Sequence, residues 1–393
     1  MDALTTPLPK AWQKVRLGDI AEIKRGVRIT KNELDVFGKY PVVSGGVGFL
    51  GYTNNFNRYE NTITIAQYGT AGYVNFQKNK FWANDVCFCV YPNKDAIKNI
   101  FLYYFLKVNQ NYLYEISNRN ATPYSISKDK ILDFEIPLPP LDEQIAIANI
   151  LSDVDRYLYS LDALILKKES VKKALSFELL SQRKRLKGFN QNWQRVRLGD
   201  IGITISGLVG KTKQDFINGN AKYITFLNVL NNVIIDTSIL ENVKIYPNEK
   251  QNSFKKYDLF FNTSSETPKE VGMCAVLLDD IDQVFLNSFC FGFRIFDKAV
   301  DGLFLSYLIN SEIGRKAFEN LAQGSTRYNL SKSGFNNVCL ILPPLNEQAT
   351  IANILSALDS EIISLKNKKR QFENIKKALN HDLMSAKIRV LKK

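Results

Sequence analysis

Side chains suited to catalysis are scarce in this sequence. His381 is the only histidine among the 393 residues, which excludes most histidine-based acid–base catalysis and histidine-ligated metal sites. None of the five cysteines forms a Cys-x-x-Cys pair, which argues against a zinc site or a disulfide framework. We therefore expect no catalytic residue, no metal ligand and no cofactor in this chain.

Two motifs resemble cofactor or catalytic motifs without their context. Gly46–Gly51 matches the dinucleotide fingerprint G-x-G-x-x-G, but Tyr52–Asn57 after it is turn-like where the fingerprint needs a helix. Leucines flank Pro139-Pro140 and Pro343-Pro344, so neither matches the Asn/Asp-Pro-Pro-aromatic motif of adenine methyltransferases. We predict a glycine-rich surface loop and two chain breaks.

Loops rich in Arg, Lys, Asn, Ser and Thr offer better candidate sites, because these side chains contact base edges and phosphates. Lys24–Lys31 places four cations around a glycine, and Ser44–Tyr52 can bring backbone N–H groups against phosphates. Each residue alone also fits a solvated loop; as a set, the loops favour DNA. The candidate DNA contacts are Lys24, Arg25, Arg28, Lys31, Ser44, Gly45, Gly46, Tyr52, Arg119, Thr122, Tyr124, Lys211, Lys213, Asn262, Ser264, Ser265, Thr267, Lys269, Thr326, Arg327 and Tyr328.

The charge balance agrees with a polyanionic partner. The formal net charge is +13, from 52 basic and 39 acidic residues, and a basic chain of this size often binds nucleic acid. No apolar run approaches the roughly 18 residues that a membrane span needs, and Met1–Ala11 lacks the apolar core of a signal peptide. We expect a cytoplasmic protein with no membrane contact.

One stretch of the chain occurs twice, and it begins the elements that must position these loops. Leu138–Ser152 returns as Leu342–Ser356 at a constant offset of 204. The double proline must end a strand, since proline fits neither a sheet ladder nor a helix interior. Asp142 and Asn346 are predicted helix N-caps, each followed by a glutamate that suits the helix dipole.

A long run without glycine or proline follows each copy, from Glu143 to about Gln182 and from Glu347 onward. Each run predicts a helix roughly 60 Å long. Apolar residues alternate at spacings of four and three, a heptad seam that needs a partner helix, most economically the other copy. Packing of each helix on its own domain is the alternative. The predicted coiled-coil interface comprises Ile147, Leu151, Val154, Leu158, Leu161, Ile351, Leu355, Leu358, Ile362 and Leu365.

A second repeat opens each half of the chain. Trp12–Ile20 returns as Trp193–Ile201 at an offset of 181, so the second unit is 23 residues longer than the first. The intervening Ala21–Asn120 and Gly202–Gly324 share little sequence. The opening and closing segments are nearly the same in both halves, which indicates one scaffold role performed twice. The intervening segments differ, which indicates a recognition role that each half performs differently.

Each unit is predicted to be α/β with the sheet dominating. The predicted strands are Thr62–Ala66, Val86–Val90, Ile131–Ile136, Tyr223–Val229, Leu259–Asn262, Ala275–Leu278 and Phe289–Phe296, and the predicted helices are Ile97–Val108 and Leu303–Leu321. The predicted domains are two globular units, 1–140 and 186–345, and two long helices, 141–185 and 346–393.

These features together resemble the specificity (S) subunit of type I restriction–modification systems. The resemblance rests on the doubled Trp…Val-x-Leu-Gly-Asp-Ile opening and the doubled Pro-Pro-Leu-[Asp/Asn]-Glu-Gln…Ile-Ala-Asn-Ile-Leu-Ser closing, with Asp258–Thr267 and the Tyr40–Tyr52 loop. It implies two target-recognition domains, similar to the DNA-recognition domain of TaqI-type adenine methyltransferases. It also implies that the two long helices pair as an antiparallel coiled coil in a pseudo-twofold internal repeat.

The resemblance also implies a function. Each domain would bind one half of an asymmetric, bipartite site on double-stranded DNA, and the coil would set the half-site spacing. The subunit would be non-catalytic, recruiting two methyltransferase (M) subunits that use S-adenosylmethionine and restriction (R) subunits that use ATP, with Mg expected on the partners. The alternatives are a fused enzyme and a coiled-coil scaffold without sequence-specific DNA binding.

Two finer expectations concern the ends of the chain and the outer helix faces. The tail Ala386–Lys393, placed next to Met1–Ala11, is predicted to feed the first unit as Gln182–Asn192 feeds the second, so the termini should lie close together. The outward helix residues Tyr157, Tyr159, Ile363 and Asn367 are candidates for contact with partner helices or for plain solvent exposure.

Overall fold

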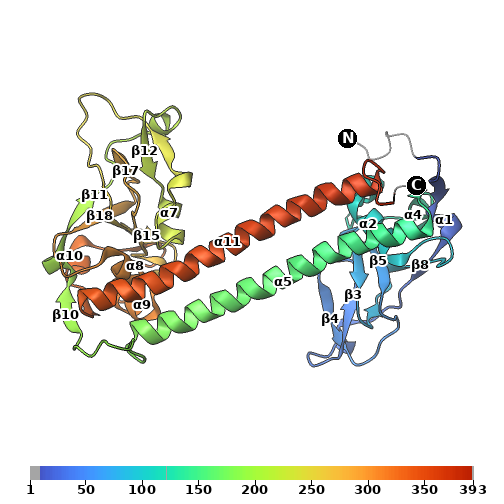
Figure 1. Ribbon diagram of the computed structural model, residues 1–393, viewed down its shortest axis with the longest axis horizontal. Coiled ribbons are helices and arrows are strands. Elements are labelled where there is room, and N and C mark those ends of the chain that lie inside the picture. The colour runs from blue at the N-terminus through green and yellow to red at the C-terminus, as the bar shows by residue number, and fades with distance from the viewer. Residues whose placement is uncertain (1–8, 121, 392–393) are drawn as a thin grey trace. The chain divides into compact units, whose positions relative to one another are not determined.

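The computed structural model describes residues 9–120 and 122–391. It forms two compact units: one joins the residues up to Ala163 with those from Lys366 onward, and the other is Leu164–Leu365. Helices α5 (Leu141–Leu180) and α11 (Leu345–Met384) each contribute residues to both units (Figure 1). Among the described residues, none of the helices combines the length and the apolar character of a membrane-spanning helix.

The first unit contains three small sheets. β1 pairs antiparallel with β9, a second sheet has the order β2-β8-β5-β6, and a third has the order β4-β3-β7. The strands are β1 (Gln13–Arg16), β2 (Ala21–Arg25), β3 (Tyr40–Val43), β4 (Phe49–Thr53), β5 (Thr62–Ala66), β6 (Val74–Gln77), β7 (Trp82–Ala83), β8 (Cys87–Pro92) and β9 (Glu135–Leu138).

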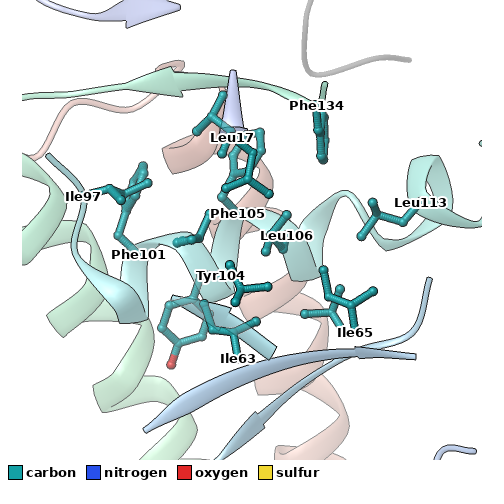
Figure 2. Close-up of a cluster of buried hydrophobic side chains, with 14 of the residues drawn as sticks. Leu17, Ile63, Ile65, Ile97, Phe101, Tyr104, Phe105, Leu106, Leu113 and Phe134 are labelled. Atoms are coloured by element: carbon teal, nitrogen blue, oxygen red, sulfur yellow. The ribbon is translucent and has the colours of Figure 1, made fainter. Parts of the chain in front are cut away.

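The short helices of this unit are α1 (Leu17–Ile20), the 3₁₀ helix η1 (Lys31–Glu33), α2 (Asn99–Val108), α3 (Gln110–Glu115) and α4 (Lys128–Leu132). α1 and α4 contact β2, and α2 contacts β5 and β6 of the four-stranded sheet. α2 is apolar along most of its length and turns Phe101, Phe105 and Leu106 into the core, against Ile63 and Ile65 of β5 (Figure 2). This core fixes the strands whose ends carry the candidate loops.

The second unit repeats this plan. Its strands are β10 (Gln194–Arg197), β11 (Gly202–Ser206), β12 (Ala221–Ile224), β13 (Glu241–Val243), β14 (Leu259–Asn262), β15 (Ser264–Ser265), β16 (Cys274–Val276), β17 (Val284–Leu286), β18 (Cys290–Ile295), β19 (Tyr328–Asn329) and β20 (Cys339–Leu342). Its helices are α6 (Leu198–Ile201), η2 (Lys213–Phe216), α7 (Phe226–Asn231), η3 (Thr237–Ile239), η4 (Pro268–Glu270), α8 (Gly302–Asn310), α9 (Glu312–Glu319) and α10 (Lys332–Asn336).

Sheet topology is the same in the two units, although their middle sequences differ. β10-β20 corresponds to β1-β9, and β11-β18-β14-β16 corresponds to β2-β8-β5-β6. In the third sheet, β3 pairs antiparallel with β4 and parallel with β7, as β12 does with β13 and β17. The predicted internal repeat of two sheet-rich α/β domains with two long helices is confirmed.

Three predicted elements are wrong in the same way, because each runs across a helix cap. The predicted strand Ile131–Ile136 is the end of α4 followed by β9, and the strand predicted at Tyr223–Val229 stops at Ile224, where Thr225 caps α7. The predicted helix Leu303–Leu321 is interrupted at Ser311, whose side chain accepts a hydrogen bond from the Gly314 N–H and starts α9. In the last two cases a Thr or Ser ends one element and caps the next, whereas α4 ends at a C-cap on Asp133.

The predicted N-caps of the long helices are also wrong by two residues. The N–H groups of Glu143 and Gln144 both donate to the Pro140 carbonyl, so α5 already begins at Leu141 and Asp142 lies in its first turn. Pro344 accepts the corresponding bonds in α11. Proline is tolerated at a helix start because its missing N–H would have no helical partner there. Its carbonyl can still accept the first helical hydrogen bonds.

The two long helices pair in antiparallel fashion within each unit. In the first, Lys369 of α11 pairs with Asp162 of α5 at 2.6 Å, and Lys376, further along α11, pairs with Asp155, further back along α5. Between these ion pairs the Tyr157 ring packs on Phe372 with centroids 4.6 Å apart, so the prediction of Tyr157 as an outward residue is wrong.

The second unit has the same antiparallel pairing. Lys168 lies 2.8 Å from Glu361, and Lys172 contacts Asp359. Moving forward along α5 therefore means moving backward along α11, as the resemblance implied. Tyr159 and Ile363 are exposed, at 77% and 57%.

Burial along the predicted seam changes from its middle to its ends. Leu161 and Ile362 are buried mid-helix, whereas Val154, Leu158, Leu358 and Leu365 are half-buried. At the ends, the seam residues join a domain core: Ile147 and Leu151 in the first unit, Ile351 and Leu355 in the second. Each helix thus packs both on its partner and on its own domain.

The doubled glutamate of the closing motif organises a three-residue cluster. Glu143 is buried and accepts hydrogen bonds from Trp12 Nε1 at 3.0 Å and from Arg389 Nε and Nη2 at 2.6 and 2.9 Å. Arg389 thereby binds the tail after α11 to the start of the first domain, and Val390 and Ala11 both pack against the core of this unit. The ends themselves lie outside the described residues, so the prediction about the termini stays a prediction.

The second unit contains the same cluster, with its arginine taken from Gln182–Asn192, the connector between α5 and β10. Glu347 accepts from Trp193 Nε1 at 3.3 Å and from Arg185 Nε and Nη2 at 2.8 and 2.7 Å. Arg185 and Arg389 are related by the same offset of 204 as the two glutamates. The C-terminal tail and the connector thus end their helices in equivalent ways, as the repeat predicted.

The glutamine of the motif joins each long helix to its domain. Gln144 is fully buried; its Oε1 accepts from the Lys98 N–H at 2.7 Å, and its Nε2 donates to the Ala96 and Pro139 carbonyls. Gln348 makes the equivalent three bonds with Asp301, Ala299 and Pro343. These bonds hold the loop before α2, or before α8, against the helix start.

A further repeated triad links each domain to both long helices. In the first unit the Tyr104 hydroxyl donates to Asp155 Oδ2 at 2.7 Å, and Lys376 pairs with the same carboxylate. In the second unit Tyr307 donates to Asp359 at 2.7 Å, and Lys172 pairs with it. Each triad takes its tyrosine from the domain, its aspartate from one helix and its lysine from the other.

Candidate nucleic-acid interface

Asn84 connects the two candidate loops of the first unit. Its Oδ1 accepts from the Ile29 N–H at 3.1 Å, its Nδ2 donates to Ser44 Oγ at 3.3 Å, and its N–H donates to the Val43 carbonyl. The basic loop and the glycine loop are therefore held side by side. Sequence reasoning missed Asn84, because a lone asparagine after a short strand carries no signal of this role.

A turn after β5 joins the glycine loop to the loop before α4. The Thr70 N–H donates to the Gly45 carbonyl at 2.8 Å, and the Gly69 N–H donates to the Tyr124 carbonyl at 3.0 Å. Thr122 and Tyr124 are exposed next to this turn. The structure thus unites three of the predicted loops of this unit into one continuous surface.

Glycines 46 and 48 have no evident structural reason to be glycine. A Cβ at Gly48 would meet nothing within 4 Å, one at Gly46 would meet only a carbonyl oxygen at 3.9 Å, and neither residue has a positive φ. Gly45 differs, since its Cβ would lie 2.2 Å from the Tyr68 carbonyl oxygen. These glycines allow another molecule to approach the backbone closely. A strand follows this loop, as expected for a surface loop and not for a dinucleotide fingerprint.

The predicted cations of this unit are exposed, but some have internal partners. Lys24 pairs with Glu22 at 3.0 Å and lies over the Tyr91 ring, and Arg25 donates to the Asp85 carbonyl. Arg119 stacks between the rings of Tyr114 and Tyr124, at 5.1 and 5.2 Å from their centroids. Arg28, Lys31 and Tyr52 are exposed on the same sheet-edge loops.

In the second unit, the corresponding loops meet in a small two-stranded sheet. β15 pairs antiparallel with β19, which sets Ser264 opposite Asn329 and Ser265 opposite Tyr328. The Thr263 N–H donates to the Phe289 carbonyl at 2.9 Å. The exposed Arg327 guanidinium lies 5.6 Å from the centroid of the exposed Phe289 ring, so Phe289 supports this cation.

Three of the predicted DNA-contacting residues in this unit are buried and stabilise the loop internally. Asn262 is fully buried and binds Ser264, Glu270 and Met273 through both its amide atoms. Ser264 and Ser265 are also buried, and Ser265 Oγ donates to Glu270. Thr267, Lys269, Thr326 and Arg327 remain exposed.

Lys211 belongs to a separate group of side chains. Only 4% of it is exposed, and its ammonium binds Glu249 and the Lys244 carbonyl. This hydrogen bond, helped by a bond from Gln251, lowers the pKa of Glu249 to about 2. Lys211 therefore holds its own loop together, whereas Lys213, at the start of η2, is exposed.

Both candidate surfaces use the same backbone frame. The Ile126 N–H donates to the Gln67 carbonyl at 2.9 Å, and the Leu330 N–H donates to the Thr263 carbonyl at 2.8 Å. The residues from the bonded position onward differ completely in sequence, with Gln67–Thr70 in one unit and Thr263–Glu266 in the other. Sequence reasoning missed Gln67–Thr70, since the equivalence appears only when β5 is matched with β14.

Comparison with known proteins assigns this architecture to one family. The model of the type I restriction modification DNA specificity domain matches residues 9–168 and again residues 190–374. The two matches cover most of the chain and coincide with the doubled frame. The chain belongs to this family.

Individual relatives agree with this assignment over the whole length. The chain is similar to the type I restriction enzyme MjaVIII specificity subunit of Methanocaldococcus jannaschii, with 27% identity over 98% of this chain and 94% of that protein. It is also similar to the putative MjaX specificity subunit of the same organism, with 28% identity over 76% of this chain and 70% of that protein. The solved type I restriction–modification S subunit of M. genitalium matches with a TM-score of 0.70 and 20% identity, covering 97% of this chain and 98% of that one. The chain is thus a type I specificity subunit by family and by fold.

Proposed function

We propose that this chain is the non-catalytic subunit that selects the DNA sequence for a type I restriction–modification complex. Each domain would bind one half of a bipartite, asymmetric site on double-stranded DNA through the loops described above. The single observation that carries the proposal is the doubled frame with unlike side chains, because one backbone plan used twice with different loops suits recognition of two different half-sites.

The partners follow from the same proposal. Two methyltransferase subunits would dock on the paired helices and supply S-adenosylmethionine chemistry, and restriction subunits would supply ATP- and Mg-dependent activity. The exposed Tyr159 and Ile363 offer apolar contacts on the outer faces of α5 and α11. The antiparallel helix pair would set the spacing of the two half-sites.

Selection from a pool of duplexes with a randomised centre tests the proposal. The full chain, purified with its methyltransferase, should enrich a motif of two short specific blocks separated by a fixed, unspecific gap. Binding should weaken steeply as salt rises, because Lys and Arg release counterions from phosphates. Enrichment of no motif at any salt concentration would instead indicate an assembly scaffold and contradict the proposal.

A further inference from the structure

Two adjacent apolar side chains project from the first unit with almost no contact to the rest of the chain. Val36 is 89% exposed and Phe37 is 93% exposed. Isolated exposed apolar residues need no explanation, but a fully displayed valine–phenylalanine pair on one turn is costly in water. Such a pair is expected where it becomes covered by another molecule.

The turn that carries this pair is held firmly. Asp35 accepts from the Phe37 N–H at 2.9 Å and from Asn54 Nδ2 at 2.6 Å, while its own N–H donates to the Tyr52 carbonyl at 2.8 Å. Gly38 presses on β4 so closely that a Cβ would lie 2.5 Å from the Thr53 nitrogen. Phe37 is thus presented by an anchored turn.

Charge around the turn favours a polyanion over a protein surface. Arg28, Lys31 and Lys39 are exposed near it in sequence. Two acids lie nearby, and both bind neutral groups: Glu33 accepts from the Thr30 N–H and hydroxyl, which lower its pKa, and Asp35 holds the turn. The three cations outnumber these two carboxylates. An apolar tip flanked by an excess of cations matches a duplex, whose apolar base faces lie between rows of phosphates.

The turn also lies on the hairpin of the candidate interface. β4 runs from the glycine loop to Tyr52 and Thr53, where the turn is bonded, and four strand residues span roughly 13 Å. The open glycines at one end can meet the phosphate backbone while Phe37 at the other end reaches the bases. One hairpin therefore offers both a backbone contact and an apolar probe.

We propose that Phe37, supported by Val36, wedges against a base step within the half-site bound by the first domain. Apolar side chains inserted at base steps partly unstack them, and pyrimidine–purine steps give way most easily. Phe37 would then determine specificity at one step without any hydrogen bond to a base. This inference rests on the proposed function, since it assumes that the domain binds DNA.

The same selection from randomised duplexes, run with wild type and Phe37→Ala, tests the wedge. Wild type should enrich a TA or CA/TG step at one fixed place in one half-site, and Phe37→Ala should lose that preference and bind the enriched duplex about tenfold more weakly. Phe37→Leu should retain part of both. Phe296→Ala, which removes an exposed aromatic ring just after β18 of the second unit, should select the wild-type motif and serves as the control.

The outcomes separate the wedge from the function on which it rests. An unchanged motif and affinity in Phe37→Ala would overturn the wedge and leave the proposed function standing. Loss of co-purification with the methyltransferase, with the DNA motif intact, would assign Phe37 to a protein contact and also overturn it. Failure of the wild type to select any motif would remove both proposals.

Discussion

Single residues of the repeated closing motif have structural roles that its sequence alone does not reveal. Glu143 and Glu347 each bind an arginine and a tryptophan from segments distant in the chain, and Gln144 and Gln348 each satisfy three backbone groups. A buried carboxylate with several donors, or a buried amide with all its partners, loses much stability if one partner is removed. The motif is therefore a joint between helix and domain.

The substitution Trp12→Phe tests this joint. It removes the indole N–H from buried Glu143 and keeps most of the packing, so the free energy of unfolding of the first unit should fall by about 2 kcal/mol. Chemical denaturation measures this loss. The matched variant Trp193→Phe should cost less, because its N–H lies 3.3 Å from Glu347 and its ring is half-buried. Equal costs at the two sites would contradict the assigned difference.

For Arg327 we make a prediction about DNA recognition by a single residue. Arg327 lies over the Phe289 ring on the exposed loop before β19, so contact with Phe289 supports its guanidinium at the surface. Arg327→Ala should weaken binding to the selected duplex by about 2 kcal/mol and relax specificity in only one half-site. A binding titration against duplexes altered in either half provides the measurement. An equal loss on unrelated DNA would show that Arg327 contacts only the phosphate backbone.

At the scale of elements, the Tyr–Asp–Lys triads fix each domain on the helix pair. Burial, together with the bonded aspartate, raises the pKa of Tyr104 and of Tyr307 well above the ordinary value, so both hydroxyls stay protonated donors. Each aspartate receives its tyrosine from the domain and its lysine from the opposite helix. One carboxylate therefore couples three elements.

Tyr104→Phe isolates this coupling in the first unit. The ring stays in place, the bond to Asp155 is lost, and the unfolding free energy should drop by about 1.5 kcal/mol. Thermal and chemical denaturation report the loss, and Tyr307→Phe should behave alike in the second unit. A loss that persists unchanged when Asp155 is first replaced by Asn would show that the hydroxyl acts elsewhere.

The sequence predicted the long elements better than the short ones. Heptad spacing and the lack of glycine and proline gave both long helices, and β5 and β14 match their predicted bounds. Errors fell where Thr225 or Ser311 caps a new helix within an apolar run, because a single cap residue outweighs the local apolar pattern. The triads escaped notice since Tyr104 and Asp155 meet only after the helix packs on the domain.

Within the candidate interface, the loops were predictable and the individual side chains were not. Composition identified the loops at Ser44–Tyr52 and Asn262–Lys269, but Asn262 and Lys211 turned inward to satisfy neighbouring groups. Whether a polar side chain points inward depends on backbone groups left unpaired nearby, such as the Met273 N–H that Asn262 binds. The sequence likewise did not indicate that the Phe37 side chain is exposed.

At the scale of the whole molecule, the family model matches the chain twice, which agrees with the proposal of two half-sites. The same sheet order, the same Trp–Glu–Arg cluster and the same triad recur in both units, while the displayed loops differ. The internal repeat thus preserves the scaffold and leaves the recognition surfaces free to differ. We expect the target to be non-palindromic for this reason.

Methylation mapping tests this account most directly. The chain would be co-expressed with its methyltransferase subunit in a host lacking that system, and modified bases in the host DNA would be read by single-molecule sequencing. We predict one bipartite motif with unlike halves and a methylated adenine on each strand. A stable complex that adds no methylation, or a motif with two identical halves, would contradict the account.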